Sequence, residues 1–406
     1  MSRREAWAVV AVATFTMTVS YIDRATLAVL APAVTKALDI DETAYGWLAS
    51  AFSVAYLVAT PVAGWWIDRV GARRGLVGSV LVWSAVAALH AVVPTFGMLF
   101  AFRIALGLAE GPGFPGAAQT VQTVLEPRDR ARGFGLLFTG SSIGGMLVPP
   151  LATWIWNLYG WRVAFLGTAV VGLLWIPLWI AVTRRPNVRA VLDHRTRDAA
   201  RAQRPKLLEL LRQPAMIRAL VGVLAAAPVI GLVHGWGSKY LVREFGLGQG
   251  DVGAYLWLPP LVFDVGAIAF GDAAARRLRH GDVPRGLYAI GAVLAAAMAL
   301  LPLARTPWEG MAIASVSLAG GGCLYTIGTA DLLARVRPEA VSFAGGTLAA
   351  AQSIALIVVN PLVGASVDST QSYDTSAIAL GLWVLPGSIA WIAWPIGRIP
   401  REGDSP

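Results

Sequence analysis

The chain has 406 residues, of which 56% are hydrophobic and only 14% are charged. Its mean hydropathy is +0.61, whereas soluble domains carry about 25% charged residues. Too few polar side chains are present to cover a soluble protein of this length, so the composition excludes a soluble globular protein. It predicts instead an all-α membrane protein with many spanning helices.

Twelve apolar segments are long enough to cross a bilayer, which takes roughly 20 helical residues. In chain order they are 6–35, 44–67, 75–93, 96–123, 133–155, 161–182, 217–241, 249–274, 285–303, 308–333, 341–366 and 375–397. A charged stretch after the sixth segment divides the chain. We therefore predict an N-terminal six-helix bundle over 1–183, a cytoplasmic linker over 184–216 and a C-terminal six-helix bundle over 217–406.

Two further patterns describe how these spans are arranged. The loops after the second and eighth spans, "GWWIDRVGARRG" and "GDAAARRLRHGD", weakly repeat one another, as expected for two pseudo-symmetric halves around a central cavity. With both termini in the cytoplasm, 26 of the 33 Lys and Arg residues, Arg218 among them, lie in cytoplasmic segments. The net charge of +9 is then a basic face beside anionic lipid, and nucleic acid is not a predicted partner.

A few charged residues interrupt the predicted spans, where a charge costs about 2.5–3.5 kcal/mol and needs a cavity or a partner. They are Asp23 and Arg24 in the first span, Arg103 and Glu110 in the fourth, and Lys239, Asp264 and Asp331 in the second half. Arg103 and Glu110 are seven residues apart and therefore share one helix face. These charges are either structural ion pairs or a proton and anion site. We favour the second reading for the first four and leave both open for Asp264 and Asp331.

Two acids and two arginines at depth suggest a coupling mechanism. A buried carboxylate is kept ionised by a neighbouring arginine. An organic anion that arrives at this arginine competes with the carboxylate, which then takes up a proton. Anion binding and proton uptake are thereby linked.

The loop "GWWIDRVGARR" after the second span carries the most specific motif. Gly64 is expected to allow close helix packing, and Asp68 to cap a helix and pair with arginine. Gly71 is expected to make the tight turn, and Arg73 to face the anionic leaflet. The spacing resembles the G-x-x-x-D-R-x-G-x-R-R signature of the major facilitator superfamily. This resemblance implies a gating role for Asp68 and Arg69.

Other segments resemble one branch of that superfamily, the anion:cation symporters, which include bacterial sugar-acid transporters. They are "YIDRATLAVLAP", "FRIALGLAEGPGFPGAAQTV", "GWRVAFLG" and "WGSKYLVREFGL". The resemblance implies that Asp23 and Glu110 take up protons and that Arg24 and Arg103 bind the substrate carboxylate. The remaining residues that it implies around the substrate are Tyr21, Tyr56, Lys239 and Asp264.

The sequence also departs from the sugar-acid pattern. Ser142 stands where Gln is common, and Gln352 and Ser353 stand where an Asn is common. The resemblance implies that these positions contact the substrate, so Gln352 and Ser353 are also predicted substrate residues. The tenth span has three consecutive glycines in place of the usual amides. These changes suggest a substrate other than a common hexuronate.

The predicted function is proton-coupled uptake, or symport, of an organic carboxylate such as a sugar acid, by alternating access. We expect no enzyme activity, no cofactor and no metal, and a monomer in the bacterial inner membrane whose partners are a small organic anion, protons and lipid. An anion exchanger or a metabolite or drug exporter of the same fold is the first alternative. A sensor that no longer transports is the second.

Overall fold

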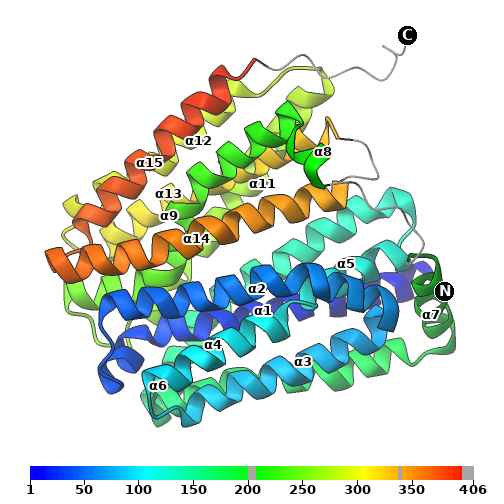
Figure 1. The fold of residues 1–406 in the computed structure, drawn as a ribbon, viewed down its shortest axis with the longest axis horizontal. Coiled ribbons are helices and arrows are strands. Elements are labelled where there is room, and N and C mark those ends of the chain that lie inside the picture. The colour runs from blue at the N-terminus through cyan, green and yellow to red at the C-terminus, as the bar shows by residue number, and fades with distance from the viewer. Residues whose placement is uncertain (200–206, 337–340, 396–406) are drawn as a thin grey trace. The chain divides into compact units, whose positions relative to one another are not determined.

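The computed structural model describes residues 1–199, 207–336 and 341–395, and Figure 1 shows that they form long helices. Contacts divide the chain into unit 1, Met1–Ala202 with Gly246–Trp257, and unit 2, Gln203–Phe245 with Leu258–Pro406. The helices up to the linker are α1 (Arg3–Ala37), α2 (Glu42–Val70), α3 (Ala72–Leu89), α4 (Phe96–Glu110), α5 (Gly113–Val124), α6 (Pro127–Thr183), α7 (Pro186–Ala199) and α8 (Leu207–Leu211). The later ones are α9 (Pro214–Phe245), α10 (Gly253–Leu256), α11 (Leu258–Arg279), α12 (Arg285–Ala296), α13 (Pro307–Leu333), α14 (Val341–Thr370) and α15 (Asp374–Ala393).

The predicted spans are confirmed, with three differences in how they are divided. The predicted eighth span is split into α10 and α11, which we count as one span. Within the described residues, ten helices are long and apolar enough to cross a membrane. The predicted fifth and sixth spans form one element, α6, which bends at Gly160 with a φ of 80°. The predicted fourth span is split into α4 and α5 around Pro112, which has no backbone N–H to continue a helix. Once α6 counts as two spans and α4 with α5 as one, all twelve are present.

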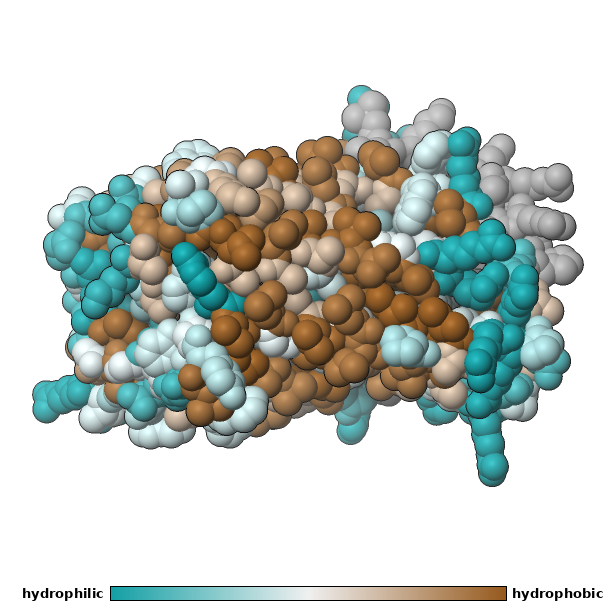
Figure 2. Space-filling view, turned by 90° about the horizontal axis from the view of Figure 1, so that it is seen from below, coloured by the Kyte–Doolittle hydropathy of each residue, from teal (hydrophilic) through white to brown (hydrophobic). Residues whose placement is uncertain are grey.

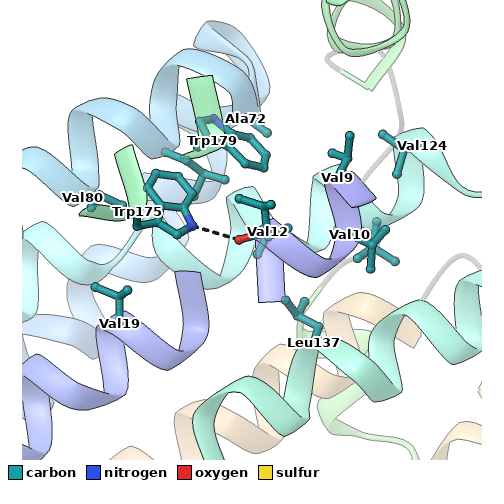
Figure 3. Packing of buried hydrophobic residues seen from close by; sticks show 14 of the residues in the cluster. Val9, Val10, Val12, Val19, Ala72, Val80, Val124, Leu137, Trp175 and Trp179 are labelled. Atoms are coloured by element: carbon teal, nitrogen blue, oxygen red, sulfur yellow. Dashed lines mark hydrogen bonds between the residues drawn. The ribbon is translucent and has the colours of Figure 1, made fainter. Parts of the chain in front are cut away.

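Unit 1 is built around a close contact between α1 and α6. A Cβ atom added at Gly140 would lie 2.4 Å from the Thr14 carbonyl oxygen, so the two backbones approach more closely than a larger residue permits. Figure 3 shows the buried cluster beside this contact, where the Trp175 indole N–H donates to the Val12 carbonyl at 2.9 Å. Stacked Trp175 and Trp179 then anchor the end of α6 to α1 and α3.

Unit 2 contains a buried ion pair that corrects one prediction. Arg218 was counted among the charges of the cytoplasmic segments, but it lies in α9 with no exposed surface. Its Nη1 donates to Asp331 on α13 at 2.6 Å, and its Nε donates to the Trp391 carbonyl on α15 at 2.9 Å. Arg335 also donates to Asp331, at 3.1 Å. The Arg218 side chain therefore ties three helices together, and Asp331 has the structural partners that one of its two readings required.

The linker contains a helix that the sequence analysis did not predict. Helix α7 follows α6, and its Val188 and Leu192 are buried in the core of unit 1. Its Asp193 accepts from Arg73 at 3.1 Å. The predicted domain boundaries at 183 and 216 stay a prediction.

Large hydrophobic side chains are exposed along several helices. Val58, Val62, Leu174 and Ile268 each expose more than 60% of their surface, and Figure 2 shows one face on which apolar side chains gather over a broad area. Exposed apolar surface on long helices is what a bilayer core requires. The helices are therefore suited to lie in lipid.

Candidate functional site

Arg24 and Glu110 form an ion pair inside unit 1. The Arg24 Nη2 lies 3.0 Å from Glu110 Oε2, and its Nε lies 3.3 Å from the same oxygen. Ser20, one turn earlier on α1, donates its hydroxyl to that oxygen at 2.8 Å. The Arg24 side chain is 31% exposed, whereas that of Glu110 is 0% exposed. The cation of the pair is therefore partly exposed, whereas its carboxylate is fully buried.

Asp23 does not take part in this ion pair. It is 2% exposed, and neither of its carboxylate oxygens has a hydrogen-bond partner among the described residues. The nearby Trp83 indole lies outside the geometry of a hydrogen bond and also has no partner there. Since Arg24 is held by Glu110, Asp23 is not the residue that positions it. A buried acid with no partner is best accommodated in its protonated form.

Arg103 is buried behind Arg24. It is 5% exposed, and its Nη1 approaches the backbone carbonyl of Arg24 at 3.5 Å. No carboxylate within ion-pair distance of Arg103 appears in the described parts of the chain. Its positive charge instead interacts electrostatically with Glu110, Tyr45 and His90. The site therefore contains one arginine paired with an acid and one without such a partner.

Aromatic rings hold both guanidinium groups. The Phe52 ring on α2 lies 4.8 Å from the Arg24 Cζ and 4.8 Å from the Arg103 Cζ. The Tyr56 ring, one turn further and stacked on Phe52, lies 4.7 Å from the Arg24 Cζ. Each such contact contributes about 0.5–2 kcal/mol, depending on its exposure to water. The ring of Tyr56 thus reaches Arg24, and Tyr21 lies half-buried on α1. The substrate contacts that the resemblance implied for both tyrosines stay predictions.

Sequence reasoning missed Ser20 and Phe52. Neither residue is charged, so neither stood out within an apolar span. Ser20 lies four residues before Arg24 on α1, and Phe52 lies four residues before Tyr56 on α2. Residues four apart share a helix face, and this periodicity is the signal that could have identified both.

The other predicted substrate residues lie in unit 2 and are described separately. Lys239 on α9 is 6% exposed, and Asp264 on α11 is half-buried. Gln352 and Ser353 lie side by side on α14, and the Ser353 hydroxyl donates to the Ala349 carbonyl of its own helix at 3.1 Å. Their predicted contacts with a substrate stay predictions.

The signature loop between α2 and α3 differs from expectation at Gly64 and Arg73. A Cβ atom at Gly64 would meet nothing within 4 Å among the described residues, so this glycine does not hold a close contact within unit 1. Arg73 was expected to face lipid, but it pairs with Asp193 of α7. Arg69 lies over the Trp65 ring at 3.8 Å.

The turn at Gly71 agrees with the sequence, whereas the helix cap expected of Asp68 is made through a neighbouring side chain. Gly71 ends α2 with a φ of 85°, a conformation that favours glycine. Asp68 accepts from the Gln119 side-chain amide at 3.1 Å, and the oxygen of that amide accepts from the Ala72 N–H at 3.0 Å. Asp68 therefore acts on the start of α3 through Gln119 on α5.

A search of the described residues finds no group of three or more His, Cys, Asp or Glu side chains that could hold a metal. Cys323, the single cysteine, is buried on α13.

Comparisons with known proteins identify the family of the chain. The model of the Major Facilitator Superfamily matches residues 13–360. Over 276 residues the chain is 26% identical to the galacturonate transporter of Dickeya chrysanthemi, covering 65% of this chain and 80% of that protein. It is 22% identical over 423 residues to the probable galactarate/D-glucarate transporter GudP of Bacillus subtilis, covering 97% and 93%. It is 25% identical over 414 residues to the probable galactarate/D-glucarate transporter GarP of Escherichia coli K12, covering 94% and 93%.

Solved structures show the same fold. The inward-facing, unoccupied crystal structure of a bacterial homolog of the human lysosomal transporter Spinster matches with a TM-score of 0.79 and 15% identity, covering 97% of each chain. At this identity the likeness concerns the fold alone. Together with the family match over most of the chain, it establishes that this multi-pass membrane protein belongs to the Major Facilitator Superfamily.

Proposed function

We propose that the chain carries a sugar acid or a related organic carboxylate across the bacterial inner membrane by alternating access, with protons entering alongside the anion. Its relatives include a galacturonate transporter and probable galactarate/D-glucarate transporters, which support this substrate class. The resemblance of its motifs to anion:cation symporters supports the coupling. Both termini are proposed to lie in the cytoplasm, as the distribution of Lys and Arg favours.

The observation that carries the proposal is the Arg24–Glu110 pair. Arg24 is the partly exposed member and can receive a carboxylate, while Glu110 is enclosed with only Ser20 and Arg24 on one oxygen. The other oxygen of Glu110 has no partner among the described residues. A substrate carboxylate that takes over Arg24 leaves Glu110 as a buried anion without its cation, which favours its protonation.

The proposed cycle assigns each site residue a role. With Asp23 and Glu110 protonated, the anion binds Arg24 from the outside, and Arg103 adds positive charge behind it. When anion and protons leave to the cytoplasm, Glu110 pairs with Arg24 again. The remaining predicted substrate contacts are Tyr21, Tyr56, Lys239, Asp264, Gln352 and Ser353, and the proposed gating residues are Gly64, Asp68, Arg69, Gly71 and Arg73.

The test is uptake of radiolabelled sugar acids into proteoliposomes with and without an inward proton gradient. Galacturonate, galactarate, D-glucarate and galactonate are the first substrates to use. We expect the gradient to drive accumulation by the unchanged protein. Glu110→Gln should lose this accumulation but retain exchange of labelled for unlabelled anion, because an uncharged side chain cannot compete for Arg24. The exposed Glu309→Gln on α13 is the matched control and should behave as the unchanged protein.

Three results would contradict the proposal. Accumulation that ignores the proton gradient but depends on internal sugar acid identifies an anion exchanger. A protein that binds a sugar acid in a thermal-shift assay, yet transports none, identifies a sensor. Binding that persists in Arg24→Gln would show that the anion site is elsewhere.

A further inference from the structure

Ser20 uses its hydroxyl group differently from four threonines on the same helix. A serine or threonine within a helix often donates to the carbonyl oxygen one turn earlier. Four buried threonines of α1 do so, and they are Thr14, Thr16, Thr26 and Thr35. Ser20 is 4% exposed and instead donates to Glu110 Oε2 on α4 at 2.8 Å. The hydroxyl of Ser20 is therefore directed at the paired acid of the candidate site.

Glu110 has few partners for a buried acid. Its side chain is 0% exposed, and among the described residues only Ser20 and Arg24 donate hydrogen bonds to it. Both donate to the same oxygen, while Oε1 has no partner in that part of the chain. An anion that takes Arg24 away therefore leaves, of these two donors, Ser20 alone on the carboxyl group.

The charged and titratable groups around Glu110 come from four helices. They interact electrostatically with Glu110 itself or with its neighbouring arginines, and they are Asp23 and Arg24 on α1, Tyr45 and Tyr56 on α2, His90 on α3 and Arg103 on α4. Of these groups, Arg24 is the one whose hydrogen bonds to Glu110 are seen in the described residues. Ser20 differs from all of them because it is an uncharged group in direct contact with the carboxyl group.

A hydroxyl group can bind a carboxyl group in both of its protonation states. It donates to the carboxylate, and it can accept from the O–H of the carboxylic acid while its own hydrogen turns to the Thr16 carbonyl one turn earlier. A hydrogen bond to the charged form is roughly twice as strong as one between neutral groups. Ser20 can therefore hold Glu110 in place in both states, and it favours the ionised one.

We propose that Ser20 is a positioning residue that sets the pH at which Glu110 exchanges its proton. This inference rests on the proposed transport function. As the anion takes over Arg24, a proton from the outside binds Glu110 Oε2, and Ser20 changes from donor to acceptor. When the anion leaves to the cytoplasm, the same proton leaves Glu110, and Ser20 donates to it again together with Arg24.

The pH dependence of anion affinity tests the role of Ser20. Calorimetry with galacturonate and galactarate from pH 5 to 8 gives the midpoint pH above which binding weakens. In Ser20→Ala the ionised carboxyl group loses a charge-assisted hydrogen bond and takes up its proton more readily. The midpoint should therefore rise by about one pH unit. Ser20→Thr keeps the hydroxyl group and should keep the midpoint.

Thr26→Val is the matched control. It removes a buried hydroxyl group of the same helix that donates to the Ile22 carbonyl at 2.7 Å, and it should leave the midpoint where it is. An unchanged midpoint in Ser20→Ala would overturn the proposal. A loss of affinity that is equal at every pH would overturn it too, because that result marks a purely structural role.

A second measurement needs no anion and no transport. Infrared spectroscopy of the purified protein follows the C=O band of protonated Glu110, which is identified by its absence in Glu110→Gln. The pH midpoint of this band should rise by about one unit in Ser20→Ala, and a fixed midpoint contradicts the role of Ser20. If no sugar acid binds to the unchanged protein, the proposed function fails instead, so the two measurements keep these failures apart.

Discussion

Removing the Asp331 carboxylate should destabilise unit 2 strongly. Asp331 is 2% exposed and accepts hydrogen bonds from Arg218 at 2.6 Å and from Arg335 at 3.1 Å. In Asp331→Asn the Arg218 guanidinium, which has no exposed surface, keeps its charge without a counter-charge. Breaking a buried pair in this way costs about 3–5 kcal/mol.

The stacked Trp391 ring, 3.5 Å from the Arg218 Cζ, and the Trp391 carbonyl at 2.9 Å offset only part of this loss. At about 2–4 °C per kcal/mol, we expect the Tm of detergent-solubilised protein to fall by roughly 10 °C. Differential scanning fluorimetry at one fixed scan rate measures this shift.

A matched control has the same substitution in an exposed pair. Asp272 pairs with Arg276 on α11, with side chains that are 58% and 69% exposed. Exposed ion pairs contribute about 0–1 kcal/mol, so Asp272→Asn should change the Tm by no more than about 3 °C. An Asp331→Asn protein as stable as the control would refute the structural reading of Asp331. A protein of normal stability that had lost transport would support the functional reading that its sequence also allowed.

Three further predictions follow from contacts within unit 1. Phe52→Leu removes the ring under two guanidinium groups and should weaken sugar-acid affinity about 3- to 30-fold, measured by calorimetry, while Phe52→Tyr should not. Gly140→Ala places a Cβ atom against the α1 backbone and should cost about 1–3 kcal/mol of stability, whereas Gly135→Ala on the same helix, with no atom within 4 Å, should not. Slight burial raises the pKa of Asp193, but the hydrogen bonds and charges of its arginine neighbours, Arg73 above all, hold that pKa below the ordinary 3.8. The pair therefore keeps its strength above about pH 4 and loses it only as the pH falls further, so Asp193→Asn should speed tryptic cleavage near α7 at neutral pH.

The number of spans could be predicted because lipid demands long apolar helices, and their lengths are visible in hydropathy. The positions at which the helices break or bend could not be predicted in this way. Hydropathy placed a boundary within α6, where the chain bends at Gly160 but stays helical on both sides. It also joined α4 to α5, because Pro112 lies in an otherwise apolar run.

Charges were harder to place than spans. Arg218 follows a basic linker and was counted with it, yet its partner Asp331 is 113 residues away. Arg73 was expected to face the anionic leaflet. Its partner, Asp193, could not be foreseen because it lies in α7, a helix with no strong sequence signal. A sequence shows which residues carry charge, whereas the identity of a long-range partner depends on packing that no local pattern records.

Within the candidate site, the four charged residues could be predicted, but their pairing could not. The adjacency of Asp23 and Arg24 suggests an ion pair between them, yet neighbours in a helix point in directions about 100° apart. Arg24 instead reaches Glu110, and Asp23 turns into the bundle toward Trp83.

This geometry separates two acids that the sequence treated alike. Under the proposed function, Glu110 shares Arg24 with the bound anion, so we expect the protonation of Glu110 to depend directly on substrate occupancy. Asp23 shares no such cation, so its protonation depends first on its burial away from water and then on the negative charge of Glu110. Glu110→Gln should therefore uncouple protons from the anion, whereas Asp23→Asn should mainly shift the pH at which the anion binds. Anion affinity measured from pH 5 to 8 distinguishes them, and identical pH profiles for the two variants would refute this division of roles.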